Sequence, residues 1–248
     1  MLEYFTPEDK KLEDNNYHKQ VRGKVSRPPD TPDDCEFTID EIRRVIEGMD
    51  NKKAPGEDGI TAEIFKQTFK ILPKSITAMY NGCLKTESSQ RYGRRQKSYR
   101  LRNQTQNSPD VTKYRPISLL NIGGKILEKA LINRINQHMN STEFLKENQY
   151  GFIPQTSTID TIMAVKQFVQ EGFSRGEITA RVSLDVEGAF NSAWRPSVLK
   201  NLQESGCPRN LFNLTKNYFS QRKATLATNN ITIERAVSRG TAGVLSRT

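Results

Sequence analysis

One segment of the chain could hold a divalent metal ion. It reads Arg181-Val-Ser-Leu-Asp185-Val-Glu-Gly-Ala-Phe190-Asn. Val182 and Leu184 are apolar and alternate with polar residues. This alternation predicts a short strand with one buried face and Asp185 at its end. A carboxylate oxygen in that place is the hard donor that Mg²⁺ prefers. Asp185 could instead cap a helix that follows the strand, and this segment alone leaves that alternative open.

Three further segments give this one a context. They read Lys53-Ala-Pro-Gly-Glu-Asp58-Gly-Ile, Tyr114-Arg-Pro-Ile-Ser-Leu-Leu-Asn-Ile-Gly-Gly-Lys125-Ile-Leu-Glu-Lys and Gln149-Tyr-Gly-Phe-Ile-Pro-Gln-Thr-Ser157-Thr. In residue identity, spacing and order, from about Phe37 to about Gly240, the four segments resemble the reverse transcriptase of non-LTR (LINE-type) retrotransposons. From the sequence, the chain is identified as a member of that family.

The resemblance implies a metal site and a sugar-binding residue. Asp185 and the carbonyl group of Val186 would bind Mg²⁺ (or Mn²⁺) in a two-metal centre. Phe190 matches the aromatic residue that in the family lies under the sugar and excludes a 2′-hydroxyl. Without the resemblance, an ordinary core aromatic is an equally good interpretation of Phe190.

The resemblance also implies contacts with phosphates. Arg115 would face the incoming triphosphate, because a planar and permanently charged fork suits phosphate oxygens. A surface salt bridge is the alternative for this residue. Lys52, Lys53 and the turn through Asp58 would lie against the template, with Asp58 itself as a turn-former.

The fold and reaction follow from the same resemblance. We expect an α+β chain that forms a partial right-hand polymerase, with helical fingers and an incomplete palm sheet. The intact parent would be an RNA-directed DNA polymerase, with an RNA template, a DNA primer and dNTPs as its partners.

The carboxylates argue against activity of this chain alone. After Glu187 the only acidic residues are Glu204 and Glu234, and the sole Asp-Asp pair is Asp33-Asp34 near the N-terminus. The second metal-binding motif of the family is therefore missing, and we expect no productive metal binding. A catalytically dead, basic nucleic-acid-binding protein and the non-functional product of a decayed element remain the alternatives.

Composition points to a polyanionic partner. The 248 residues include 38 Lys and Arg against 28 Asp and Glu, which gives a net charge of +10. This excess favours nucleic acid over an acidic-substrate pocket. No run of apolar residues is long enough to cross a membrane, and the N-terminus lacks a signal-peptide core. We therefore expect an intracellular protein, cytoplasmic or nuclear; its oligomeric state stays open.

The chain divides into three predicted regions. Residues 1–36 are polar and proline-containing, which predicts a flexible linker or arm. Residues 37–177 would form the fingers-like region and residues 178–248 a partial palm. Within the fingers, residues 86–110 are a degenerate basic segment, for which we predict disorder because its cationic side chains repel one another.

Apolar periodicity predicts most of the helices. Thr38 and Glu41 form a capping box for a helix that ends at Gly48. Further helices follow the Pro-Gly turn at 55–56 and Pro73, then run from 124 to 139 and from 158 to about 172, and two more open at Pro196 and Pro208. Their predicted inward residues are Ile64, Phe65, Phe69, Ile76, Met79, Tyr80, Leu84, Ile126, Leu127, Ala130, Leu131, Ile135, Ile162, Val165, Phe168, Val169, Val198, Leu199, Leu202, Leu211, Leu214 and Tyr218.

Lys125 and Lys129 are assigned to a solvated helix face. Residues 224–228 and 231–237 flank Asn229-Asn230, a pair that tolerates positive φ, and so predict a hairpin. The three cysteines are widely separated and are interpreted as reduced thiols.

Overall fold

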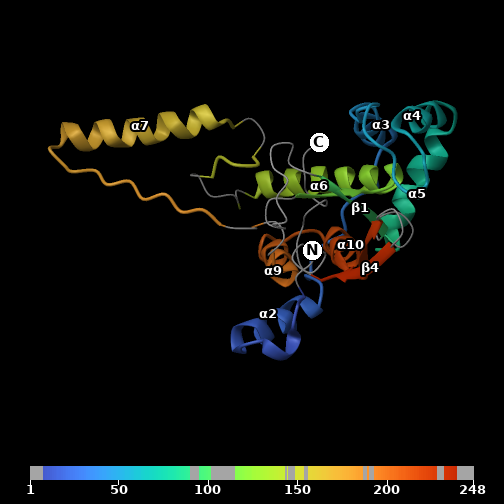
Figure 1. Ribbon diagram of the computed structural model, residues 1–248, viewed down its shortest axis with the longest axis horizontal. Coiled ribbons are helices and arrows are strands. Elements are labelled where there is room, and N and C mark those ends of the chain that lie inside the picture. Colours follow the sequence, from blue (N-terminus) through green and yellow to red (C-terminus); the bar gives the residue numbers. More distant parts are fainter. Residues whose placement is uncertain are drawn as a thin grey trace. The chain divides into compact units, whose positions relative to one another are not determined.

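The computed structural model describes residues 8–89, 95–101, 115–142, 144, 149–153, 156–186, 189, 193–227 and 232–238. The chain divides into two compact units, one made of residues 1–138 and 188–248 and the other of residues 139–187. Figure 1 traces both units along the sequence. These units differ from the predicted fingers and palm, whose boundaries remain a prediction.

A four-stranded mixed sheet lies in the first unit, with the strand order β2-β1-β3-β4. Strands β1 (Arg95–Leu101) and β2 (Arg115–Leu119) are antiparallel, β3 (Arg222–Ala227) runs parallel to β1, and β4 (Thr232–Val237) is antiparallel to β3. Because Ala227 pairs with Thr232, the predicted hairpin is confirmed, although Asn229-Asn230 lies outside the described residues. Two far-apart parts of the sequence thus meet in one sheet.

Strand β1 corrects one prediction. It lies inside residues 86–110, where we predicted disorder, yet its backbone pairs with β2 on one side and β3 on the other. Hydrogen bonding along both edges offsets the charge repulsion on which that prediction rested. Residues 90–94 and 102–110 of the predicted segment lie outside the described residues.

Helices enclose the core of the first unit. They are α2 (Asn16–Ser26), α3 (Ile39–Glu47), α4 (Ala62–Ile71), α5 (Pro73–Lys85), α6 (Ile122–Ser141), α9 (Arg195–Glu204) and α10 (Arg209–Phe219), after a short 3-10 turn, η1 (Lys11–Glu13). The capping box of Thr38 and Glu41 is confirmed. The inward faces predicted for α5, α6, α9 and α10 bury Tyr80, Leu127, Leu199 and Leu214, among others. On α4 the prediction is right for Phe69 and wrong for Ile64, which is exposed.

The N-terminal region is more ordered than predicted. Residues 16–26 form α2, which packs against α9 and buries Val21 and Val25. Arg22 bonds both Asp9, at 2.6 Å, and Asp14, at 2.5 Å. The flexible-arm prediction rested on mixed charges and prolines, but here the opposite charges pair with one another. It is therefore wrong for the α2 segment.

The second unit contains α7 (Thr158–Ser174), which begins at a capping box of Ser157 and Asp160. Its predicted inward residues Ile162, Val165 and Phe168 are exposed, so the helix is confirmed and its buried face is not. In this unit, Gly172 is the one buried residue among those that the structure describes. The unit thus has no apolar core within its described part.

Two further observations bear on the sequence predictions. Among the described residues, no helix combines the length and apolar character needed to span a bilayer. The three cysteines are free thiols, Cys35 exposed and Cys83 and Cys207 buried. Burial raises the pKa of Cys207 to about 12.

Candidate nucleic-acid interface and metal-binding segment

Lys52 and Lys53 lie in the loop of residues 50–61 between α3 and α4, and both are exposed. Asp50 shapes the start of this loop, since its side-chain Oδ1 accepts the backbone N–H of Lys52 at 2.9 Å. Asp58 shapes the end, accepting the backbone N–H of Ile60 at 3.2 Å. The assignment of Asp58 as a turn-former is therefore confirmed.

The middle of the loop is fixed to the start of α6. The backbone N–H of Glu57 donates to Asn121 Oδ1 at 3.0 Å, and Lys125 Nζ donates to the carbonyl of Ala54 at 3.2 Å. Between them Gly56 lies directly against Asn121, where an added Cβ would come within 2.6 Å of the Asn121 backbone. We call these contacts of Asn121, Lys125 and Gly56 the loop clasp.

Lys125 is therefore not on the solvated face to which the sequence assigned it. It is half-buried, and its bond to Ala54 explains why the helix presents it to the loop. Burial lowers the pKa of Lys125, and the nearby charge of Lys53 lowers it further, against the opposing effects of Asp58 and Glu128. Charges of both signs thus surround Lys125 where the loop meets α6.

Arg115 is the first residue of β2 and pairs with Leu101 of β1. The chain continues from β2 through Leu120, which is buried, directly into Asn121 and α6. The predicted phosphate-binding residues Arg115, Lys52 and Lys53 therefore belong to one compact unit.

Asp185 and Val186 belong to the other unit. Residues 177–186 have no regular secondary structure, and Val182 and Leu184 are 82% and 90% exposed, so the predicted strand is absent. A segment of alternating apolar and polar residues forms a strand only where a neighbouring strand supplies hydrogen bonds and where another element buries its apolar face. Asp185 is exposed, and its Oδ1 accepts the backbone N–H of Val186 at 2.9 Å. Phe190 lies outside the described residues.

The donors for a metal centre do not gather within the described part of the chain. No group of three or more His, Cys, Asp or Glu side chains there could hold a metal ion. The described residues therefore do not fit a two-metal site, and we derive no metal-dependent step from them.

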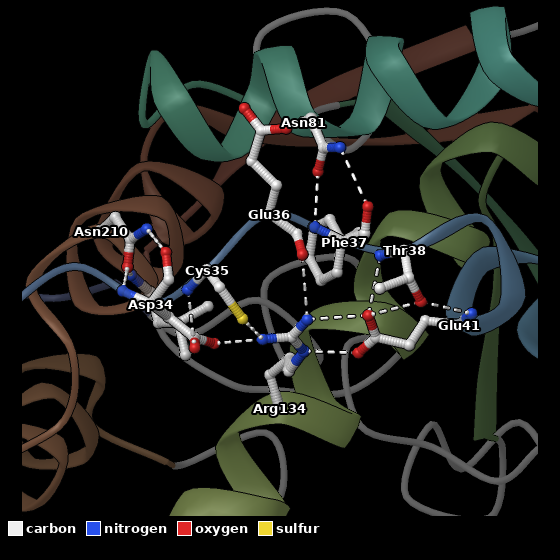
Figure 2. Close-up of polar contacts among 10 residues, drawn as sticks. Asp34, Cys35, Glu36, Phe37, Thr38, Glu41, Asn81, Arg134 and Asn210 are labelled. Carbon is white, nitrogen blue, oxygen red and sulfur yellow. Dashed lines mark hydrogen bonds and ion pairs between the residues drawn. The ribbon is translucent and has the colours of Figure 1, made fainter.

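Sequence reasoning missed the residue that anchors α6. Figure 2 shows Arg134 of α6 surrounded by the segment that leads into α3. Its Nε donates to Glu41 Oε1 at 2.6 Å, and its Nη1 donates to Asp34 Oδ2 at 2.8 Å. The guanidinium also lies 5.4 Å from the centre of the Phe37 ring. An arginine in a helix carries no local signal of such partners, because they lie far away in the sequence.

A second cluster missed by the sequence lies one turn beyond Lys125. Tyr218 of α10 donates its hydroxyl to Glu128 Oε2 at 2.9 Å. Burial raises the pKa of Glu128 to about 8, while the positive charge of Arg222 acts in the opposite direction. The guanidinium of Arg222, itself 1% exposed, lies 4.7 Å from the centre of the Tyr218 ring. The raised pKa of the half-buried Glu128 thus favours the protonated carboxyl group near neutral pH.

Known proteins with similar sequences come from mobile elements. One is the RNA-directed DNA polymerase from the mobile element jockey of Drosophila funebris, 28% identical over 190 residues, which cover 75% of this chain and 20% of the relative. Another is the Pol polyprotein from the type-1 retrotransposable element R1 of Bradysia coprophila, 28% identical over 217 residues, 87% of this chain and 21% of the relative. The chain thus spans about a fifth of the length of these curated relatives.

A family model gives the same result over the region that contains both Arg115 and Asp185. The model described as reverse transcriptase (RNA-dependent DNA polymerase) matches residues 102–242, more than half of the chain. The match includes three of the four segments singled out in the sequence, those that contain Arg115, Ser157 and Asp185. The chain belongs to the reverse transcriptase (RNA-dependent DNA polymerase) family, in the branch carried by non-LTR retrotransposons.

Proposed function

We propose that the chain forms part of an RNA-directed DNA polymerase that acts inside the cell, in the cytoplasm or nucleus. The observation that carries the proposal is the family match over residues 102–242, a range that contains Arg115, Asp185, Val186 and Phe190. In the whole protein an RNA template, a DNA primer and dNTPs would be the substrates. Lys52 and Lys53, which are exposed in the loop that the clasp joins to α6, support the part of this proposal that concerns nucleic acid.

Each predicted residue then has a defined task. Arg115 would bind triphosphate oxygens through its planar fork, and Phe190 would contact the sugar. Asp185 and the carbonyl oxygen of Val186 would be metal ligands. Because the described carboxylates do not assemble around Asp185, we propose that this chain by itself binds nucleic acid without extending a primer.

The binding part of this proposal predicts a strong dependence on salt. Affinity for an RNA–DNA hybrid should fall steeply as salt rises, because a protein with a net charge of +10 releases counterions when it contacts phosphates. The double substitution Lys52→Ala and Lys53→Ala should reduce the slope of log K against log [salt] by about 1.5 and the affinity by about tenfold. Fluorescence anisotropy across a salt series measures both quantities.

The control for this prediction removes the same charge elsewhere. Lys11 of η1 and Lys19 of α2 are both exposed and lie outside the 50–61 loop. Replacing these two by alanine should change the slope much less than the loop variant does. Equal effects of the two double variants would show that binding depends on overall charge and not on this loop.

The catalytic part of the proposal predicts no polymerase activity for this chain alone. Purified protein given a primed RNA template, dNTPs and Mg²⁺ or Mn²⁺ should extend the primer no more than its Asp185→Ala variant does. The physical reason is that one exposed carboxylate lacks the anionic charge that two adjacent divalent ions need. Extension that Asp185→Ala abolishes would refute the proposed inactivity and would locate the metal ligand.

A further inference from the structure

The loop clasp joins two points of the loop to one face of α6. Asn121 and Lys125 are four residues apart, so they lie above one another on the first turn of the helix. The first backbone bond of that turn, from Lys125 N–H to the Asn121 carbonyl at 3.0 Å, keeps them in this arrangement. Ala54 and Glu57 are the matching points on the loop. Two hydrogen bonds to a single helical turn fix both the position and the orientation of the loop.

Asn121 occupies the position just before the first residue of α6. A side-chain oxygen at that position commonly accepts a backbone N–H of its own helix. Here Asn121 Oδ1 accepts the N–H of Glu57, a residue of the loop. The adjacent Gly56 approaches so closely that a side chain would have to displace the Asn121 backbone. The loop therefore packs against the Asn121 backbone as well as bonding to the Asn121 side chain.

The side chain of Lys125 lies in a different environment from the side chains of Lys52 and Lys53. It donates to the Ala54 carbonyl and belongs to a half-buried side chain, whereas the two loop lysines are exposed. The loop lysines directly precede Ala54, so the clasp fixes the backbone from which their side chains extend. A cation held in place in this way binds a phosphate at a smaller cost in conformational entropy.

We propose that Asn121 and Lys125 are positioning residues for nucleic-acid binding, which present Lys52 and Lys53 to the phosphates without contacting phosphate themselves. This inference rests on the proposed function, because it assumes that the loop lysines bind nucleic acid. It assigns Lys125 an indirect role, although its charge and position would suit a direct contact.

A double-mutant cycle separates the two roles. In the otherwise unchanged protein, Asn121→Ala and Lys125→Met should each weaken binding to an RNA–DNA hybrid by about threefold to tenfold, because the lysines lose their fixed position. In a protein that already carries Lys52→Ala and Lys53→Ala, the same substitutions should cause no further loss. A direct phosphate contact by Lys125 would instead give a second, additive loss, and that result would overturn the proposal.

Trypsin cleavage provides a readout that does not depend on binding. Loosening the clasp should speed cleavage after Lys52 and Lys53 several-fold, because a protease needs a locally detached backbone. The matched control is Asn210→Ala, which removes a buried amide that forms two bonds of 2.9 Å with Asp34 and one with the backbone N–H of Leu211, and none with the loop. It should lower the melting temperature without accelerating cleavage at the loop lysines and without weakening nucleic-acid binding.

The outcomes distinguish this inference from the proposed function. If the unchanged protein shows no salt-dependent binding, the proposed function fails, while faster cleavage in Asn121→Ala still verifies the clasp. If binding depends on Lys52 and Lys53 but is unaffected by both clasp substitutions, the inference alone fails. Should Asn121→Ala not fold, Lys125→Met removes the second hydrogen bond of the clasp and carries the same test.

Discussion

Replacing Arg134 by alanine is expected to lower the free energy of unfolding by about 2–4 kcal/mol, somewhat less than for a fully buried ion pair. Arg134 is 9% exposed and bonds two carboxylates, those of Glu41 and Asp34. Removing it leaves both carboxylates without their cation, and each is too enclosed to be hydrated fully. Because these acids are about a quarter exposed, at 25% and 23%, water offsets part of the loss. Urea unfolding followed by circular dichroism measures the change.

Two variants make this prediction specific. Arg43 pairs with Asp40 within α3 in an exposed i,i+3 arrangement, so Arg43→Ala should cost less than about 0.5 kcal/mol. Arg134→Met keeps the apolar stem and removes the charge together with the guanidinium contact to Phe37, so it should recover only the part of the loss that comes from contacts of the stem. If Arg134→Ala cost no more than Arg43→Ala, the cluster in Figure 2 would not anchor α6.

The Arg134 cluster illustrates which parts of the fold a sequence can predict. The capping box of Thr38 and Glu41 is visible within four residues, and it sets the start of α3 as predicted. The same Glu41 also bonds Arg134, 93 residues away, and no local pattern indicates that second bond. Local hydrogen-bond chemistry therefore predicted where α3 begins, whereas the contacts between helices came only from the structure.

Apolar periodicity predicted faces correctly only where a neighbour covers them. The faces of α5 and α10 are buried by each other and by the remaining helices of the first unit. The faces predicted for α7 and for residues 182–186 are exposed, since nothing within their own unit covers them in its described part. Periodicity indicates that one face of a segment can be buried. Whether another element buries it depends on parts of the chain that are far away in the sequence.

Sequence also predicted some residues of the candidate site and not others. Motif order identified Asp185, Arg115 and the loop lysines as residues of interest, and the family match includes the first two. Asn121 could not be recognised as a partner of the loop, because Glu57 is 64 residues away and its contribution is a backbone N–H. Gly56 did carry a signal, since a glycine after a proline marks a turn, but the sequence does not show what approaches it.

Glu128 should make the protein less stable as pH rises from about 4.5 to about 8. Burial raises the pKa of this carboxyl group from 4.5 in the unfolded chain to about 8 in the folded protein. Between these values the folded protein keeps a proton that the unfolded chain has released, so unfolding becomes easier with each increase in pH. Below pH 4.5 both forms are protonated and above pH 8 both are ionised, so the contribution is flat outside this window.

Glu128→Gln tests this prediction, because glutamine stays neutral and keeps a side-chain oxygen that can accept a hydrogen bond from the Tyr218 hydroxyl. At pH 8 the variant should be more stable than the unchanged protein by on the order of 2–3 kcal/mol, and the difference should vanish near pH 4.5. Urea unfolding at several pH values measures it. Glu47→Gln removes an exposed carboxylate and controls for net charge.

If Glu128→Gln destabilised the protein at pH 8, the carboxylate would instead be ionised in the folded state. Its attraction to the Arg222 guanidinium would then outweigh the cost of its burial.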